Sequence, residues 1–294
     1  MTKKVVFLVL LTLTIVLTIL FFSVKKKKVF FPRENEIKVI NENNIKEKIE
    51  YLNKKLKSSL EDTKEETNIL VELGIYYFLR GHQFYDKAIN CFYTAWKLGS
   101  TDIRIFYYLG CMYEFLKLYD LAIEEYKKFL RNMPNDKEVI IRLGNLYFQT
   151  KRIEDAIKMY EKVLKMDKNN VVALTNLGVV YYNNKEISNA IEYFNKVLTI
   201  SKKKNIVEPR NVNFYLGKIF FENKNYQTAK EYLETEYKKY PDNLENIFLL
   251  IKTYYFLKEY NNAYQLIQQI KEFVPENREI VVIQRELKKI LKKG

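Results

Sequence analysis

A short pattern, Leu-Gly-x-x-aromatic, recurs along this chain of 294 residues and is followed each time by an alanine at nearly the same distance. Five leucine–glycine pairs begin at Leu73, Leu109, Leu143, Leu177 and Leu216, and a degenerate sixth copy begins at Leu250. The alanines are Ala88, Ala122, Ala156, Ala190, Ala229 and Ala263, spaced by 34 residues except for one interval of 39. A period of this length indicates an array of repeats in which each unit packs on its neighbours.

Each repeat is predicted to form two helices. In the third repeat, apolar residues recur at helical spacing from Val139 to Tyr147, a polar turn follows over residues 151–155, and helical spacing resumes from Ala156 to Leu164. Glycine inside a helix is about 0.5–1 kcal/mol less favourable than alanine, so its return in five helices indicates close approach of a second helix. A large side chain one turn after each alanine is expected to fill the remaining space. These side chains are Phe92, Tyr126, Tyr160, Phe194, Leu233 and Ile267.

The combination of Leu-Gly-x-x-Tyr, an alanine twelve residues after the glycine, an aromatic residue four positions later and a proline near the end of the unit resembles the tetratricopeptide repeat. The prolines are Pro134, Pro241 and Pro275. The resemblance implies an all-α fold, a right-handed α-solenoid of about six helix pairs. The expected repeats are 67–102, 103–136, 137–170, 171–209, 210–243 and 244–275.

The chain departs from the family pattern at several positions. The residue expected to be tryptophan is never tryptophan, and Ile251 replaces the glycine of the last repeat. Two extra residues lie in the first repeat near Gly81. Five more, over 205–209, separate the fourth and fifth repeats, and they predict a longer loop or a local break in the stacking.

Both ends of an array need a helix that covers the exposed packing surface of the last repeat. Residues 276–294 are expected to provide a C-terminal capping helix, because apolar residues recur at helical spacing over 277–292. Residues 29–66 are expected to form a polar linker and an amphipathic helix. The stripe of that helix is Ile45, Ile49, Leu52 and Leu56. This helix either caps the first repeat or pairs with a second copy as a short coiled coil.

Residues 1–28 are expected to form a membrane anchor. The twenty residues from Val5 to Val24 carry no charge and span roughly 30 Å as a helix, about the thickness of a hydrocarbon core. A cleaved signal peptide is the alternative, but its apolar core is usually shorter and ends in small residues. Here the run ends in four lysines, 25–28. We therefore expect a single-pass membrane protein whose lysine cluster weakly favours cytoplasmic repeats.

The net charge of +14 at a pI of about 9.3 raises the possibility of nucleic-acid binding. Most of this excess lies outside the repeats, in the two terminal segments. Within the repeats, lysine and glutamate alternate as they do on solvated helical surfaces. The lysines beside the apolar run are suited to anionic lipid headgroups.

The sequence gives little support for an enzyme. His82 is the only histidine, and it falls in the turn of the first repeat. Cys91 and Cys111 lack the spacing of metal ligands or redox pairs. No phosphate-binding glycine loop or nucleophile motif occurs. We therefore expect a protein that is not an enzyme, with no cofactor, no metal and no catalytic residues.

In the family that the chain resembles, the first helices of successive repeats line a concave groove that binds the partner. Carried over by position, the groove residues are Val71, Ile75, Phe78, Tyr107, Cys111, Glu114, Ile141, Asn145, Phe148, Thr175, Val179, Tyr182, Phe214, Lys218, Phe221, Phe248, Lys252 and Tyr255. This set is rich in apolar and aromatic side chains, which favours a hydrophobic peptide or amphipathic helix as partner.

The family's best-known groove binds a C-terminal carboxylate through asparagines and cations. Asn145 and Asn176 match the asparagines, but Ile141, Asn211 and Tyr215 stand where cations are needed. A buried carboxylate without cations is poorly stabilised, which argues against this type of site. The sequence therefore predicts a membrane-anchored scaffold for a partner protein. The alternatives are a basic repeat protein that binds nucleic acid or an anionic membrane surface, or an array that self-assembles through its groove.

Overall fold

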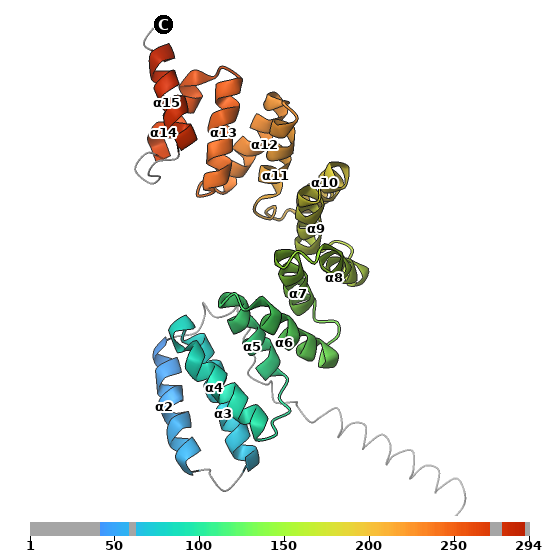
Figure 1. Cartoon of the computed structure of the whole chain (residues 1–294), viewed down its shortest axis with the longest axis vertical. Coiled ribbons are helices and arrows are strands. Elements are labelled where there is room, and N and C mark those ends of the chain that lie inside the picture. The colour runs from blue at the N-terminus through green and yellow to red at the C-terminus, as the bar shows by residue number, and fades with distance from the viewer. Residues whose placement is uncertain (1–41, 59–62, 271–277, 292–294) are drawn as a thin grey trace, which may run out of the picture. The chain divides into compact units, whose positions relative to one another are not determined.

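The computed structural model describes residues 42–58, 63–270 and 278–291, which form fourteen α-helices, one short 3-10 helix and no strand (Figure 1). They divide into two compact bodies, one reaching to Met112 and the other beginning at Tyr113. The predicted membrane segment, residues 5–24, lies outside the described residues. Within the described ranges, none of the helices combines the length and the apolar character needed to cross a membrane.

The helices follow one another as consecutive pairs. In chain order they are α2 (Glu42–Ser58), α3 (Thr63–Leu79), α4 (Tyr85–Lys97), α5 (Arg104–Phe115), α6 (Tyr119–Asn132), α7 (Lys137–Gln149), α8 (Ile153–Met166), α9 (Val171–Asn183), α10 (Ile187–Lys204), α11 (Val212–Glu222), α12 (Tyr226–Lys239), α13 (Leu244–Phe256), α14 (Tyr260–Ile270) and α15 (Arg278–Leu291). Close pairs include α3 with α4, α7 with α8, and α9 with α10. The prediction of an all-α solenoid of helix pairs is confirmed.

The repeated glycines lie where the two helices of a pair touch. A Cβ atom at Gly144 would stand 2.7 Å from Cε1 of Tyr160, and one at Gly178 would stand 2.6 Å from Cε1 of Phe194. Both rings are almost fully buried, so they have no room to move away. At Gly217 the same space is filled by Leu233. The predicted contact between each glycine and the large side chain of its partner helix is confirmed at these positions.

Lysine takes the left-handed backbone conformation just after each of the first helices α5, α7, α9, α11 and α13. These residues are Lys117, Lys151, Lys185, Lys224 and Lys258, with φ between 60° and 66°. In each turn the lysine N–H and the following N–H bond to carbonyls of the last helical turn. Lys151, for example, donates to Phe148 O at 3.0 Å, and Arg152 donates to Tyr147 O at 2.7 Å. This is the Schellman motif, whose left-handed position glycine usually occupies.

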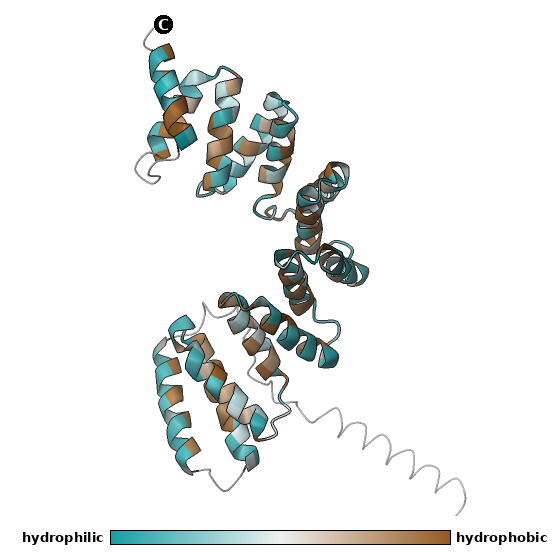
Figure 2. Cartoon of the chain, in the orientation of Figure 1, coloured by the Kyte–Doolittle hydropathy of each residue, from teal (hydrophilic) through white to brown (hydrophobic). Residues whose placement is uncertain are grey.

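The helix α2 packs against α3 within the first body. Ile45, Ile49 and Leu52 are buried, and Nδ2 of Asn53 donates to the hydroxyl of Tyr77 at 3.4 Å. Apart from Leu56, which is half-buried, the rest of α2 is mostly hydrophilic (Figure 2). Of the two predicted arrangements, the structure therefore has α2 covering the first repeat.

The loop between α10 and α11 holds the five extra residues, and stacking continues across it. The ring of Tyr215, on α11, stacks on Phe194, on α10, with centroids 5.6 Å apart. A set of polar contacts, which we call the loop latch, ties the loop to α12. Oε1 of Glu236 accepts the backbone N–H of Asn211 at 2.8 Å, and the Tyr240 hydroxyl donates to Glu208 O at 2.7 Å. The sequence left open a longer loop or a break, and the structure shows a longer loop.

The loop latch predicts a large effect for one buried carboxylate. Glu236 is fully buried, so Glu236→Ala leaves the Asn211 N–H without its acceptor and should lower the free energy of unfolding by about 1.5–3 kcal/mol. Urea denaturation would measure this, with the exposed Glu231→Ala on the same helix as the control. An equal effect of the two substitutions would contradict a structural role for the latch.

The carboxyl of Glu236 should also make the free energy of unfolding depend on pH. Burial raises the pKa of Glu236, although the Asn211 N–H opposes the shift. The native chain therefore binds a proton here more readily than the unfolded chain, and this group favours the native state increasingly as the pH falls through the raised pKa. The destabilisation by Glu236→Ala should accordingly be larger at mildly acidic pH than at neutral pH.

The last described helix, α15, packs on α13 and α14. Its buried residues Ile280 and Leu287 join the apolar cluster that contains Leu250 and Leu266. The remaining side chains of α15 are mostly charged or exposed. This helix thus covers the packing surface of α13 and α14.

Candidate functional site

The predicted groove residues lie on one face of the first helices, at positions i, i+4 and i+7 of each; we call this the first-helix face. In the first body they are all buried, with exposed fractions of 2% or less. They are Val71, Ile75, Phe78, Tyr107 and Cys111. The ring of Phe78, for example, lies between Tyr85 of α4 and Tyr108 of α5. These residues offer no surface to a partner in this structure.

In the second body the first-helix face is more open. Its half-buried members are Glu114, Ile141, Asn145, Phe148, Val179, Lys218, Phe221, Phe248, Lys252 and Tyr255. Three further members, Thr175, Tyr182 and Phe214, are buried. The Thr175 hydroxyl turns back to Val171 O at 2.7 Å, which withdraws it from the surface. What remains accessible is an apolar and aromatic stripe that carries two lysines.

Polar side chains connect the first-helix face of one repeat to the next. Oδ1 of Asn145 accepts from the Tyr160 hydroxyl at 2.7 Å and from Nδ2 of Asn176 at 2.9 Å. These are the two asparagines that match the carboxylate clamp, and in this structure they bond to each other. The position that would bind a carboxylate is thus used for contact between repeats.

A similar arrangement joins α5 and α6 to α7. Oε2 of Glu114 accepts from the Tyr126 hydroxyl at 2.8 Å and from Nη1 of Arg142 at 3.0 Å. Arg142 also bonds Oε1 of Glu138 at 3.2 Å. Because Glu114 and Arg142 are both half-buried, their pairing is less screened by water than a surface salt bridge.

Where the second helix carries phenylalanine, an aromatic ring makes the contact between repeats. Tyr215 stacks on Phe194 and lies 5.3 Å from Tyr182. The Tyr182 hydroxyl donates to Oε1 of Glu222 at 2.7 Å. Burial, and secondarily the Glu222 carboxylate, raises the pKa of Tyr182. Tyr182 therefore stays a neutral hydrogen-bond donor at physiological pH.

The two lysines of the first-helix face are held in different ways. Nζ of Lys218 lies 5.3 Å from the ring centre of Tyr182 and 5.8 Å from that of Phe214, within cation–π range. Lys252 forms an ion pair with Glu279 of α15. The same helix approaches Tyr255, whose hydroxyl donates to Oε2 of Glu286 at 2.5 Å. The stripe is therefore most open between α7 and α11.

Sequence reasoning missed the residues that reach back to the preceding repeat. Apart from Asn176 and Tyr215, which were considered only as clamp positions, these include Tyr108 and Arg142. All of them stand one residue before the motif leucine. Their shared position was the available signal, but their residue types differ, so no chemical pattern distinguished them.

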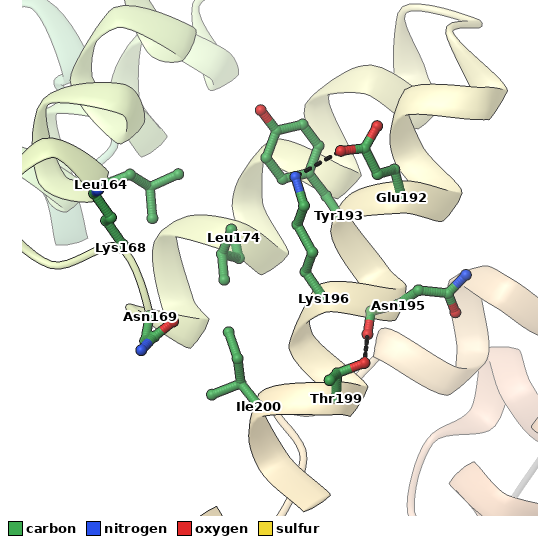
Figure 3. A pocket seen from close by; sticks show the side chains of 10 residues that line it. All are labelled: Leu164, Lys168, Asn169, Leu174, Glu192, Tyr193, Asn195, Lys196, Thr199 and Ile200. Atoms are coloured by element: carbon green, nitrogen blue, oxygen red, sulfur yellow. Dashed lines mark hydrogen bonds and ion pairs between the residues drawn. The ribbon is translucent and has the colours of Figure 1, made fainter. Parts of the chain in front are cut away.

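The structure also places a cleft of about 680 Å³ on another side of α9, between α8 and α10 (Figure 3). Leu164, Leu174 and Ile200 supply apolar walls, and Lys168 and Asn169 stand at the turn between α8 and α9. Lys196 pairs with Glu192 at 2.6 Å across the adjoining surface of α10. The sequence did not predict this cleft, because it depends on how α8, α9 and α10 pack in space.

The two cysteines are free thiols that lie within helices. Burial raises the pKa of Cys91 to about 11, so its thiol stays protonated at neutral pH. Cys111 is buried. Within the described ranges, no three histidine, cysteine or acidic side chains are placed to hold a metal ion.

Comparison with protein families gives four matches, all to one kind of repeat. A model described as TPR repeat matches residues 144–185, and models described as tetratricopeptide repeat match residues 103–136, 171–203 and 220–281. No curated protein gives a significant match to the chain.

Several solved structures share the fold. The structure of pilF from Pseudomonas aeruginosa is 21% identical, with a TM-score of 0.60 over 76% of this chain and 99% of its own. PilW, described as a widely conserved type IV pilus biogenesis factor, is 18% identical, with a TM-score of 0.58 over 74% of this chain and 97% of its own. A protein from Parabacteroides merdae is 14% identical, with a TM-score of 0.55 over 84% of this chain and 88% of its own.

Proposed function

Because the chain belongs to the tetratricopeptide repeat family, we propose that it is a scaffold that binds a partner protein on the first-helix face of its second body. The observation that carries the proposal is the half-buried stripe of apolar and aromatic side chains, among them Phe148, Val179 and Phe221. Large apolar side chains that remain partly exposed in a row are more typical of interaction surfaces than of neutral surface.

The partner that suits this stripe is a hydrophobic peptide or an amphipathic helix. Apolar side chains of the partner would lie against Phe148, Val179 and Phe221, and an acidic group beside them would meet Lys218. Lys218 already lies over two aromatic rings, so its charge is held in place before a partner arrives. A cation that is held in place in this way would favour one orientation of the partner along an otherwise apolar surface.

Photo-crosslinking in cells tests the proposal. A photoreactive phenylalanine analogue at Phe148 or Phe221 should give a covalent adduct with one partner, whereas the same analogue at Lys158, an exposed position on α8, should not. An adduct at twice the mass of the chain would indicate self-association and would replace the proposed partner by a second copy. Equal adducts from all three positions would contradict specific binding at this face.

Once the crosslinked partner is identified, the effect of substitutions on its affinity can be predicted. Truncation of an apolar side chain at the centre of an interface typically weakens binding by about 1–2 kcal/mol, or roughly tenfold. Phe148→Ala and Val179→Ala together should therefore weaken binding of the identified partner by about a hundredfold. Lys158→Ala is the matched control and should leave the affinity unchanged.

We further propose that the apolar run at residues 5–24 anchors the array in a membrane as a single span, with the repeats on the cytoplasmic side. Its length and the lysines that follow it support this placement. Protease protection in intact cells tests the orientation. Digestion of the repeats by an external protease would show the opposite orientation. Recovery of the chain in the soluble fraction would contradict the membrane anchor.

A further inference from the structure

The helix α10 is longer than its counterparts and ends in an unusual sequence. It has 18 residues, whereas α6, α8 and α12 each have 14. The extension ends with three exposed lysines, Lys202, Lys203 and Lys204, and the loop after it exposes Ile206 and Val207. Val207 is 74% exposed and Ile206 44%. We call residues 202–207 the α10 tip.

The backbone of the α10 tip is ordered by its own hydrogen bonds. Asn205 takes the left-handed conformation at φ 50°, and the N–H of Ile206 donates to Ser201 O at 3.0 Å. This closes the helix with a Schellman turn, and asparagine is among the residues that tolerate the left-handed position. The turn directs the chain away from the helix and leaves Ile206 and Val207 in solvent.

The base of the α10 tip is fixed by the loop latch. Besides the contacts of Glu236 and Tyr240, Arg210 pairs with Asp242 at 2.7 Å, and Glu208 forms an ion pair with Lys239. Glu208 is thus matched by Lys239 of α12, and Asp242 is matched by Arg210 of the loop. The three lysines of the tip have no ion-pair partner within the described part of the chain.

The cleft of Figure 3 lies next to the last turns of α10. Asn169 lies across it from Ile200, which together with Thr199 precedes the tip lysines by about one helical turn. The nearby Asp167 is 3.4 Å from Lys137, so it too has a cation of its own. The positive charge beside the exposed Ile206 and Val207 is therefore that of Lys202, Lys203 and Lys204.

We propose that the α10 tip docks on an anionic phospholipid surface. Lys202, Lys203 and Lys204 would contact phosphate and carboxylate headgroups, while Ile206 and Val207 would enter the interfacial region. Adjacent lysines are attracted to anionic leaflets, and exposed aliphatic side chains gain by leaving water at the headgroup boundary. A bilayer fits better than a protein partner, because the two aliphatic residues lie on an exposed tip rather than in an enclosing pocket.

An environment-sensitive fluorophore attached through Val207→Cys in the full chain tests the proposal. The native thiols are poorly reactive, since Cys111 is buried and burial raises the pKa of Cys91 to about 11. With phosphatidylcholine vesicles that contain phosphatidylserine, the emission should shift to the blue and the label should be shielded from iodide. With phosphatidylcholine alone, neither change should occur. The readout is specific to the tip, so it does not depend on whether residues 5–24 also hold the chain at the vesicle.

Each lysine near an anionic surface contributes on the order of a fivefold change in binding, so Lys202→Gln, Lys203→Gln and Lys204→Gln together should reduce the docking equilibrium by about a hundredfold. The matched control replaces Lys117, Lys151 and Lys185 by glutamine, which removes the same charge elsewhere and should leave docking intact. A label that stays exposed to iodide on anionic vesicles would overturn the proposal. So would equal shielding on uncharged vesicles, or equal loss in the control.

Discussion

Gly178→Ala should destabilise the wild-type chain but stabilise a chain that also carries Phe194→Ala. In the wild type, the new Cβ would lie 2.6 Å from Cε1 of the buried Phe194 ring. Overpacking of a filled core costs about 1–3 kcal/mol, which exceeds the gain of about 1 kcal/mol from replacing glycine inside a helix. Phe194→Ala alone should cost about 3–5 kcal/mol through the cavity that it leaves.

Once that ring is gone, only the helix preference of alanine remains, so the sign of the Gly178→Ala effect should reverse. Urea denaturation of the two single variants and the double variant measures the coupling. Gly74→Ala, which meets Phe92 at 2.6 Å in the first body, is the control. Its cost should be the same with or without Phe194→Ala, since the two sites share no partner. An unchanged sign at Gly178 would show that the close approach is not what selects glycine there.

Replacing all five left-handed lysines by glycine should stabilise the second body by about 2.5–5 kcal/mol. A side chain in this conformation costs about 1–2 kcal/mol, and glycine recovers this apart from about 0.5–1 kcal/mol of extra entropy in the unfolded chain. The net gain is therefore about 0.5–1 kcal/mol at each of the positions. They are Lys117, Lys151, Lys185, Lys224 and Lys258.

The urea midpoint of the fivefold variant measures this gain. Lysine-to-glutamine replacement at the same positions removes the charge but keeps the strained backbone, so it should leave the midpoint nearly unchanged. Lys158→Gly, in the middle of α8, should instead destabilise by about 1 kcal/mol. If glutamine stabilised as much as glycine, repulsion between charges rather than backbone strain would account for the effect.

The sequence predicted the helix pairs and the contacts of the glycines, because both follow from spacing within one repeat. Gly144 and Tyr160 are sixteen residues apart, and the equivalent residues have the same spacing in every regular copy of the motif. Their contact therefore follows from the local sequence pattern. The left-handed lysines were not predicted, since lysine has no preference for positive φ. Only their common distance marks them: each lies seven residues after the motif position that is glycine in four of these repeats and Ile251 in the last.

The site was harder to predict, because it depends on contacts between repeats. Position within the motif assigned Val71 and Ile75 to the same face as Phe148, yet the first two are fully buried and the third is not. The loop latch likewise joins Glu236 to Asn211, across 25 residues and two helices. Such contacts depend on how neighbouring helices stack, and the periodic pattern does not contain that information.

The residue before each motif leucine matches the large side chain of the preceding repeat. Tyr126 and Tyr160, which carry hydroxyls, meet Arg142 and Asn176 through a shared acceptor, whereas Phe194 meets the flat face of Tyr215. Repeats with the same backbone fold therefore cannot simply replace one another in the array. Exchanging the third and fourth repeats would set Arg142 against the apolar ring of Phe194, which offers it no hydrogen-bond partner. The order of the repeats is thus encoded in their junctions, so the array could not lengthen by simple duplication without further changes at each new boundary.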